Sequence, residues 1–297
     1  MFYYFIVNPN SGAGKGLRAW NHIKQFLNKQ KTGYEVHFTA GTGDARELAK
    51  QLTENCHSER CIIAVGGEGT MNEVLDGISF SCPVVLGFIP SGCRDTLLKS
   101  MGLPRDRRRW ADKLLLNCDA KPADYGVVSS AESGCIRRFL ISTGVGFEAA
   151  VCKGLLKEPC EEGQQTGRGF VTGGRLKDLQ EALKQLFFAK PVRGWILLDG
   201  EQRIEFNNII SISARILPQG GLELCVVSAR SKLKVLWPLL REDGLLRRAK
   251  PGVRLFSCSE AHIHTEFPLA VHADWENCKE QTDLDVRCVR GQLRFLR

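Results

Sequence analysis

Two kinds of segment alternate over the first 121 residues, and this alternation is the feature that most constrains the fold. Apolar runs of strand length stand at 2–7, 34–38, 61–65 and 84–89. Segments with helical periodicity follow them at 15–29, 44–54, 70–77, 95–101 and 108–116. Strands joined by helices lie parallel in a sheet that is covered on both faces. We therefore expect an α/β domain over residues 1–122.

The pattern changes after residue 124. Short β-rich runs separated by Gly, Pro and Asn turns stand at 139–143, 195–198, 203–206, 209–213, 223–227, 254–257 and 262–265. A single long amphipathic helix is expected at 176–189. Strands of this length joined by turns are typical of antiparallel sheets. The sequence therefore predicts a second domain over residues 123–297, a mainly antiparallel β-sandwich.

Composition narrows the partners and the compartment. The net charge of +8 suits phosphates or anionic lipid headgroups and is too small for an obligate nucleic-acid binder. The 12 cysteines include no C-x-x-C pair, which favours buried thiols in a reducing cytoplasm over zinc or disulfides. The first apolar run lacks a basic leader, and no apolar run reaches the about 18 residues of a membrane span. Contact with a membrane would thus be peripheral.

Glycine-rich loops follow three of the four predicted parallel strands. They read Asn8-Pro9-Asn10-Ser11-Gly12, Gly66-Gly67-Glu68-Gly69-Thr70 and Pro90-Ser91-Gly92. Ligands of open α/β sheets bind where strands end, and glycines let backbone N–H groups approach a phosphate before a helix begins. Each loop alone is typical of an ordinary βα turn, but the three together favour nucleotide binding. Neither a P-loop nor G-x-G-x-x-G occurs.

These loops and several later motifs resemble the diacylglycerol kinase catalytic-domain family, which includes sphingosine, ceramide and bacterial lipid kinases. Residues 66–74 are similar to its GGDGT-x-NEV signature, and 89–92 with 100–104 to its IP-x-GTGNDFAR-x-LGLP segment. Thr39 with Gly43-Asp44-Ala45 matches a nucleotide-contacting element. Further matches are residues 144–149 and the late Asp274-Trp275-Glu276, which stands in the place of the family's DGE.

The resemblance implies an ATP-dependent kinase that uses Mg²⁺ to phosphorylate the hydroxyl of diacylglycerol or a related lipid. It implies a Rossmann-like nucleotide domain of the NAD kinase and diacylglycerol kinase type, a C-terminal lipid-substrate sandwich, and an active site in the cleft. The implied catalytic residues are Asp274 and Glu276, and the implied metal ligands are Asp124, Glu68 and Asp95. The implied nucleotide-binding residues are Asn8, Pro9, Asn10, Ser11, Gly12, Thr39, Gly66, Gly67, Glu68, Gly69, Thr70, Asn72, Glu73, Gly92 and Cys93.

Two readings of Asp274 and Glu276 follow from the residues themselves. Side chains at i and i+2 of a strand project from one face, so the pair is expected to point the same way. The alternative is a pair of solvated charges at a strand end. A second Asp-Gly-Glu, at Asp199-Gly200-Glu201, is better explained as a hairpin turn.

The chain also departs from the family pattern. Arg94 and Thr96 replace a glycine and an aspartate, Glu68 and Glu148 replace aspartates, and Gly220 stands where bacterial members carry a metal-binding acid. These changes leave open a catalytically impaired nucleotide- or lipid-binding member. NAD kinase-like activity is the other alternative, because NAD kinases share the GGDG loop.

Weaker signals concern partners. The basic stretches at 105–109 and at Arg247, Arg248 and Lys250 suit docking on an anionic membrane surface. His262 and His264 are predicted to be histidines of a strand face, because no set of ligands completes a zinc site around them. We expect a cytoplasmic protein in peripheral contact with a membrane that holds its lipid substrate. A homodimer is left open.

Overall fold

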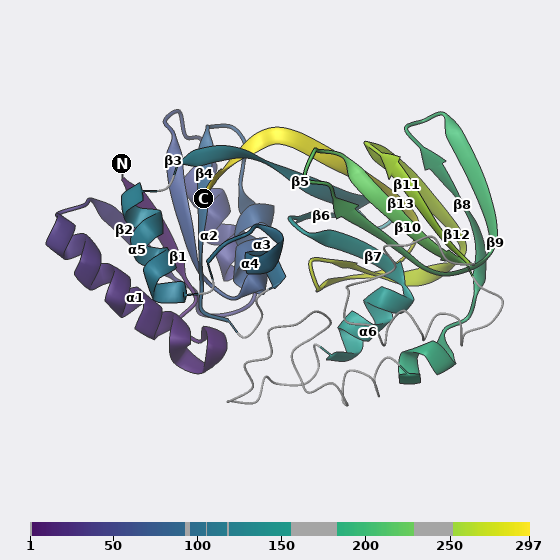
Figure 1. The fold of residues 1–297 in the computed structure, drawn as a ribbon, viewed down its shortest axis with the longest axis horizontal. Helices are drawn as coiled ribbons and strands as arrows, with labels where there is room; N and C mark the ends of the chain where they lie inside the picture. The colour runs from purple at the N-terminus through teal and green to yellow at the C-terminus, as the bar shows by residue number, and fades with distance from the viewer. Residues whose placement is uncertain (1, 93–95, 105, 118, 156–182, 229–251) are drawn as a thin grey trace. The chain divides into compact units, whose positions relative to one another are not determined.

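The computed structural model describes residues 2–92, 96–104, 106–117, 119–155, 183–228 and 252–297. The chain forms two compact units (Figure 1). The first contains Met1–Ala123 and Gly291–Arg297, and the second contains Asp124–Arg290. The change of unit near residue 123 lies one residue from the boundary that the sequence indicates. The last seven residues were expected in the second domain, and they return to the first unit instead.

The first unit is built on a parallel sheet. Its strands are β1 (Tyr3–Val7), β2 (Tyr34–Phe38), β3 (Arg60–Gly66) and β4 (Val84–Pro90), in the order β4-β3-β1-β2. All neighbours pair in parallel. From the second residue of β3 and along all of β4 every residue is buried, as expected for strands covered on both faces.

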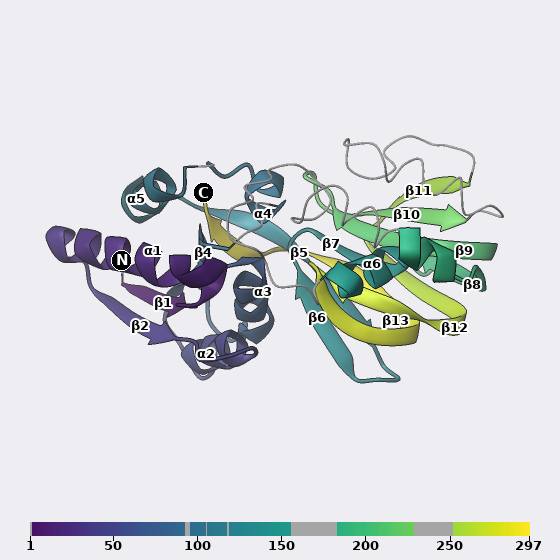
Figure 2. The same ribbon diagram turned by 90° about the horizontal axis from the view of Figure 1, so that it is seen from below.

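Helices cover both faces of this sheet (Figures 1 and 2). On one face α1 (Ser11–Gln30) and α5 (Arg107–Asn117) are joined by His22 and Asp112, whose Nε2 and Oδ1 atoms are 3.0 Å apart. On the other, α2 (Asp44–Thr53) and α3 (Glu68–Gly77) are joined by Arg46 and Asp76, at 3.1 Å. The short α4 spans Thr96–Ser100. The predicted alternation of strands and helices is therefore confirmed.

The strand order contains one reversal of direction. From β1 the chain moves outward to β2, and it then crosses back over β1 to β3 and on to β4. Because such crossovers are right-handed, a reversal sends consecutive helices to opposite faces. The helices that follow β1 and β3 therefore lie on opposite faces of the sheet, and the switch point between these two strands is where doubly wound sheets bind ligands.

The C-terminal end of the chain completes the first sheet. Strand β13 (Glu276–Leu296) ends with Arg294 opposite Val85 and Phe295 opposite Leu86, parallel to β4. Leu293, Phe295 and Leu296 are buried. Burial of this apolar tail against β4 explains why residues 291–297 belong to the first unit.

The second unit is mainly antiparallel, as predicted. The path β11-β10-β9-β7-β12-β13 is antiparallel throughout, β8 pairs with β9 and β12, and β5 pairs with β6. The sandwich arrangement stays a prediction. The strands are β5 (Ala120–Ser130), β6 (Cys135–Phe139), β7 (Ser142–Gly146), β8 (Val192–Leu198), β9 (Gln202–Ile216), β10 (Leu222–Ser228), β11 (Val253–Cys258) and β12 (Glu260–Ala273).

Three local expectations for the second unit are corrected. The strand expected at 139–143 is interrupted at Leu140 and Ile141, between β6 and β7. The runs 203–206 and 209–213 are parts of the single strand β9. Helix α6 (Phe147–Leu155) was not expected. Of the helix expected at 176–189, residues 183–188 are helical and residues 176–182 lie outside the described residues.

None of the described helices combines the length and the apolar character needed to cross a bilayer.

Candidate active site

The three glycine-rich loops meet at the carboxyl end of the first sheet. The Asn8 N–H donates to the Val65 carbonyl at 2.9 Å, and the Ser91 N–H donates to the Gly66 carbonyl at 2.8 Å. Side chains add to these bonds, since Asn8 Nδ2 donates to Thr70 Oγ1 at 3.2 Å and the hydroxyls of Ser11 and Ser91 are hydrogen-bonded. The convergence expected from parallel strands is therefore present.

Glycine is required where these loops touch. Gly12 has φ of 56°, and a Cβ there would collide with the carbonyl of Ser91. A Cβ on Gly92 would lie 2.7 Å from the Cα of Gly67. A side chain at either position would push two backbones apart. The result is a surface of bare backbone at the switch point.

This backbone offers several N–H groups to an anion. Gly12, Ala13 and Gly14 have left-handed φ values of 56°, 55° and 80°, and the Gly14 N–H donates to the Asn10 carbonyl at 3.4 Å. Successive backbone N–H groups in tight turns of this kind can form a concavity that suits an anion. Gly67 is the N-cap of α3 and has no side chain with which to cap the first N–H groups of that helix. Both features suit the phosphates of a nucleotide.

Three predicted nucleotide-binding residues outside the glycine-rich loops are Thr39, directly after β2, and Asn72 and Glu73, in α3. Two of them hold neighbouring segments in place. The Thr39 N–H donates to the Val7 carbonyl at 2.9 Å, and the side chain of Thr39 is buried. Glu73 Oε1 accepts the Gly43 N–H at 2.9 Å, which fixes the β2–α2 loop to α3. Asn72 is buried in the same helix. The bond to Glu73 brings the β2–α2 loop beside the middle of α3.

Glu68 lies in the first turn of α3 and is buried. Its Oε1 accepts the N–H of Leu97, at the beginning of α4, at 2.7 Å. Cys93 and Asp95, the other predicted residues of that segment, lie outside the described residues. In the parts of the chain that the structure describes, no three His, Cys, Asp or Glu side chains are grouped to hold a metal ion. The metal-ligand roles of Glu68, Asp95 and Asp124 therefore stay predictions.

Asp124 begins the second unit, close to a turn at Gly220 and Gly221 with φ of 87° and 89°. A Cβ on Gly220 would lie 3.2 Å from both Asp124 Oδ2 and Arg290 Nε. Where bacterial relatives were expected to carry an acid, this chain thus places a guanidinium beside Asp124. An arginine supplies a fixed positive charge at that position.

Asp274 and Trp275 form the turn between β12 and β13. Strand β12 ends at Ala273, strand β13 begins at Glu276, and these two residues pair across the turn. Asp274 and Trp275 have φ of 44° and 77°, as the central residues of a type I′ turn do. The expectation that Asp274 and Glu276 share one face of a strand is therefore wrong, because the chain reverses between them.

The carboxylate of Asp274 is buried and accepts three backbone hydrogen bonds. Its Oδ2 accepts the Leu140 N–H at 2.5 Å, and its Oδ1 accepts the N–H groups of Ile141 and Ser142 at 2.9 and 2.8 Å. A solvated strand-end charge is thus excluded, since only 3% of Asp274 is exposed. The same bonds explain the break between β6 and β7, because Leu140 and Ile141 donate to a side chain instead of a strand. Glu276 is half-buried.

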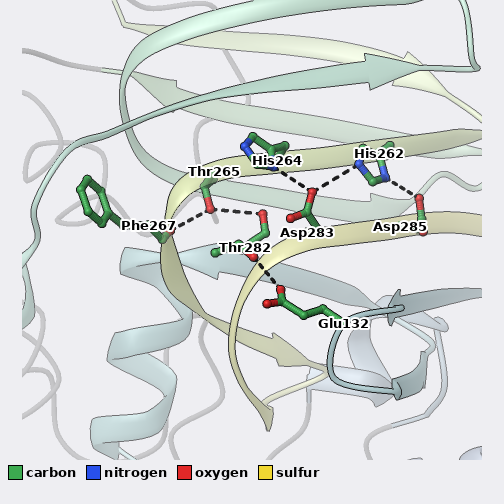
Figure 3. Close-up of polar contacts among 8 residues, drawn as sticks. All are labelled: Glu132, His262, His264, Thr265, Phe267, Thr282, Asp283 and Asp285. Atoms are coloured by element: carbon green, nitrogen blue, oxygen red, sulfur yellow. Dashed lines mark hydrogen bonds and ion pairs between the residues drawn. The ribbon is translucent and has the colours of Figure 1, made fainter.

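Two predictions on turns and strand faces are confirmed. Asp199 and Gly200, with φ of 49° and 72°, form the hairpin between β8 and β9. His262 and His264 lie on one face of β12, where Nδ1 of each is bound to an aspartate of β13, at 2.7 Å to Asp285 and 2.8 Å to Asp283 (Figure 3). The hydrogen bond with His264 lowers the pKa of the Asp283 carboxyl.

Comparison with known proteins shows what the chain is similar to. Residues 3–128 match the model of the diacylglycerol kinase catalytic domain. A Bacillus subtilis (strain 168) protein named "Putative lipid kinase YtlR" is 24% identical over 92% of this chain and 93% of its own length. A diacylglycerol kinase of the same organism is 35% identical over 42% of this chain and 41% of its own.

Solved structures show the same fold. A diacylglycerol kinase from Bacillus anthracis str. Sterne gives a TM-score of 0.68 at 17% identity, and a second crystal structure from that organism gives 0.73 at 18%. Each match covers 99% of this chain and 96% of the other. The mixed α/β fold, with mostly strands in its C-terminal part, is thus that of diacylglycerol kinase structures.

The chain is therefore an enzyme of the transferase class, a kinase. Residues 3–128 match the catalytic domain of diacylglycerol kinases, in agreement with the resemblance inferred from the motifs, and the relative that covers 92% of the chain is named a putative lipid kinase.

Proposed function

We propose that this protein transfers the γ-phosphoryl group of ATP to the hydroxyl of diacylglycerol or a closely related membrane lipid. One observation carries the proposal: in a chain that is similar to lipid kinases, three glycine loops converge at the switch point of a parallel sheet. Phosphoryl transfer depends mainly on positioning and on stabilising charge. A rigid backbone concavity supplies both.

The residues present fit a triphosphate. The N–H groups of Gly12, Ala13 and the first turn of α3 would hold the phosphate oxygens, and ATP would supply the transferable phosphoryl group. Mg²⁺ is usually bound by one or two carboxylates together with phosphate oxygens. Glu68, next to the N-terminus of α3, is the described carboxylate whose place suits that role.

For the acceptor hydroxyl we propose different roles for the two acidic residues of the second unit. Three N–H donors hold the carboxylate of Asp274, which makes it a strong anchor for the 140–142 loop. Glu276 is more exposed and begins β13 directly after the turn. We assign the orientation of the lipid hydroxyl to Glu276 and the geometry of the turn to Asp274.

Membrane contact is proposed for the start of α5. Arg107, Arg108 and Arg109 occupy its first turn, and the Arg109 side chain is 89% exposed although its Nε lies 3.4 Å from Asp106 Oδ2. Exposed arginines near an anionic surface contribute about 1 kcal/mol each. The expected residues Arg247, Arg248 and Lys250 lie outside the described residues. Cytoplasmic location and a homodimer stay predictions.

A phosphoryl-transfer assay tests the proposal. Labelled ATP is offered with diacylglycerol, ceramide, sphingosine and NAD, for the wild type, Gly12→Val and the matched variant Ala13→Gly. We expect transfer to a lipid. Gly12→Val should lose at least about 100-fold in kcat/KM, because its side chain displaces the Ser91 backbone. Ala13→Gly should keep activity, because glycine adopts the left-handed φ of 55° more easily.

The alternative is a nucleotide-binding family member without turnover. It is favoured by Arg94 and Thr96, which stand where the family pattern has glycine and aspartate. Calorimetric ATP binding without transfer to any acceptor, followed by transfer in the double variant Arg94→Gly, Thr96→Asp, would establish it in place of the kinase. Transfer to NAD alone would also contradict the lipid assignment.

A further inference from the structure

A buried acid and a buried histidine meet over a glycine in the second unit. His272 of β12, Gly144 of β7 and Ser213 of β9 are neighbours in one row across three antiparallel strands. Residues paired in this way project from the same face of a sheet. Helix α6 packs against all three strands and brings Glu148 onto this row. Because Gly144 has no side chain, the side chains of His272 and Glu148 occupy the space above it.

The approach at Gly144 is close. A Cβ on Gly144 would lie 2.5 Å from His272 Nε2 and 3.3 Å from Glu148 Oε2. His272 Nε2 and Glu148 Oε1 are 3.9 Å apart, and the two residues are 1% and 7% exposed. Among the described residues His272 Nε2 has no hydrogen-bond partner. The glycine is therefore needed for the two side chains to face each other.

The other nitrogen of His272 points to the Asp274-Trp275 turn. The Trp275 N–H donates to His272 Nδ1 at 3.3 Å, and the two rings stack with centroids 5.9 Å apart. An accepting Nδ1 leaves the proton of the neutral ring on Nε2, the atom that faces Glu148. His272 thus connects Glu148 to the backbone of the turn.

Burial of these two side chains lowers the stability of the folded state. Burial raises the pKa of Glu148 to about 7 and lowers the pKa of His272 to about 4. Two ionisable groups in the interior disfavour folding more than apolar residues of the same volume would. Groups kept in such surroundings are candidates for a role beyond stability.

We propose that Glu148 and His272 are positioning residues that hold the Asp274-Trp275 turn, and with it Glu276, in the geometry needed for phosphoryl transfer. The turn is then fixed from two sides. The Asp274 carboxylate binds the loop that begins β7, while His272 binds the Trp275 N–H and is backed by Glu148, at the start of the helix that follows β7. This inference rests on the proposed lipid kinase function.

Two substitutions of His272 separate its nitrogens. In His272→Asn the amide oxygen can take the place of Nδ1 and accept the Trp275 N–H. In His272→Gln the amide nitrogen takes the place of Nε2, and the acceptor for Trp275 is lost. The Gln variant should lose about 10- to 100-fold in kcat with KM for ATP unchanged, the loss typical of small misplacements at a reacting centre. The Asn variant should recover most of that loss.

Glu148→Ala and Glu148→Gln form the second pair, and His264→Gln is the matched control on the same strand. Glu148→Ala should lower kcat like His272→Gln, and Glu148→Gln should retain more activity because its oxygen still faces Nε2. His264→Gln should leave kcat unchanged. The proposal would be overturned if His272→Asn and His272→Gln lost kcat equally and in proportion to their loss of stability. Glu148 and His272 would then have a structural role only.

Hydrogen exchange separates this proposal from the kinase assignment. In the full-length protein, the amide of Trp275 should exchange at least about 10-fold faster in His272→Gln and Glu148→Ala than in wild type or His264→Gln. Unchanged exchange in both variants would overturn the positioning role even if the kinase is active. Faster exchange in a protein that phosphorylates no lipid would refute the proposed function and, with it, the catalytic purpose of the pair.

Discussion

Two hairpin turns of the second unit have the same backbone form and very different surroundings. Asp199-Gly200 joins β8 to β9, and Asp274-Trp275 joins β12 to β13. Both turns have positive φ at both central residues, and in both the aspartate accepts backbone N–H groups from a neighbouring segment. The first aspartate is exposed and the second is buried.

The two turns differ in how well their residues suit the backbone conformation. Asp-Gly is the dipeptide that a type I′ turn favours, because glycine adopts positive φ without cost. The second turn places Trp275 at φ of 77°, where a side chain costs roughly 1–2 kcal/mol. Strain of this kind persists where surrounding contacts over-determine the conformation, which is common at functional sites. The Asp274-Trp275 turn fits that description.

The largest expected difference comes from removing the aspartates. Asp274→Ala leaves three N–H groups without their acceptor in a buried place, which should cost about 3–5 kcal/mol of unfolding free energy. Asp199→Ala removes two bonds at the surface and should cost about 1 kcal/mol, since water replaces the acceptor. Urea denaturation of both variants measures this contrast. Equal losses would mean that the buried turn is no more constrained than the exposed one.

The next expected effect is a dependence of the unfolding free energy on pH, caused by the buried Glu148 near the Asp274-Trp275 turn. The folded-state pKa of Glu148, about 7, is above the unfolded value of 4.5, so the fold binds its proton more tightly. Its contribution to stability is full below pH 4.5 and is lost as the pH rises through 7. The side chain that the variant Glu148→Gln introduces cannot ionise. The unfolding free energy of this variant, relative to that of the wild type, should therefore rise by about 2–3 kcal/mol between pH 5 and pH 8. A constant difference across this range would contradict the raised pKa.

The first-unit site was largely predictable from sequence, because its geometry follows from local rules. Parallel strands end at one edge of a sheet, so the loops beginning at Asn8, Gly66 and Pro90 had to lie near one another. Their glycines mark backbone contacts, as at Gly12 and Gly92. Strand and helix periodicity was sufficient to place this site.

The second-unit site was not predictable in this way. The bonds of Asp274 reach residues 132 to 134 positions away, and no local pattern encodes such contacts. The turn was missed because Trp275 is not a turn residue, whereas Asp199-Gly200 was recognised. The pairing of Glu148 with His272 depends on the register of β7 and β12 at Gly144, which periodicity does not set. The late return of residues 291–297 is also a long-range contact.

The smallest expected effect tests whether the exposed turn is only a turn. Gly200 has φ of 72° and open space around it, so Gly200→Ala should cost about 1 kcal/mol of stability from backbone strain alone. Gly200→Asn should cost less, because asparagine tolerates the left-handed region better than alanine does. Lipid phosphorylation should be unchanged in both variants, which thermal denaturation and the transfer assay together measure. Loss of transfer in a stable Gly200 variant would show that the exposed turn also takes part in the reaction. The buried contacts of Asp274 would then not distinguish the turn proposed to act in phosphoryl transfer from an ordinary hairpin turn.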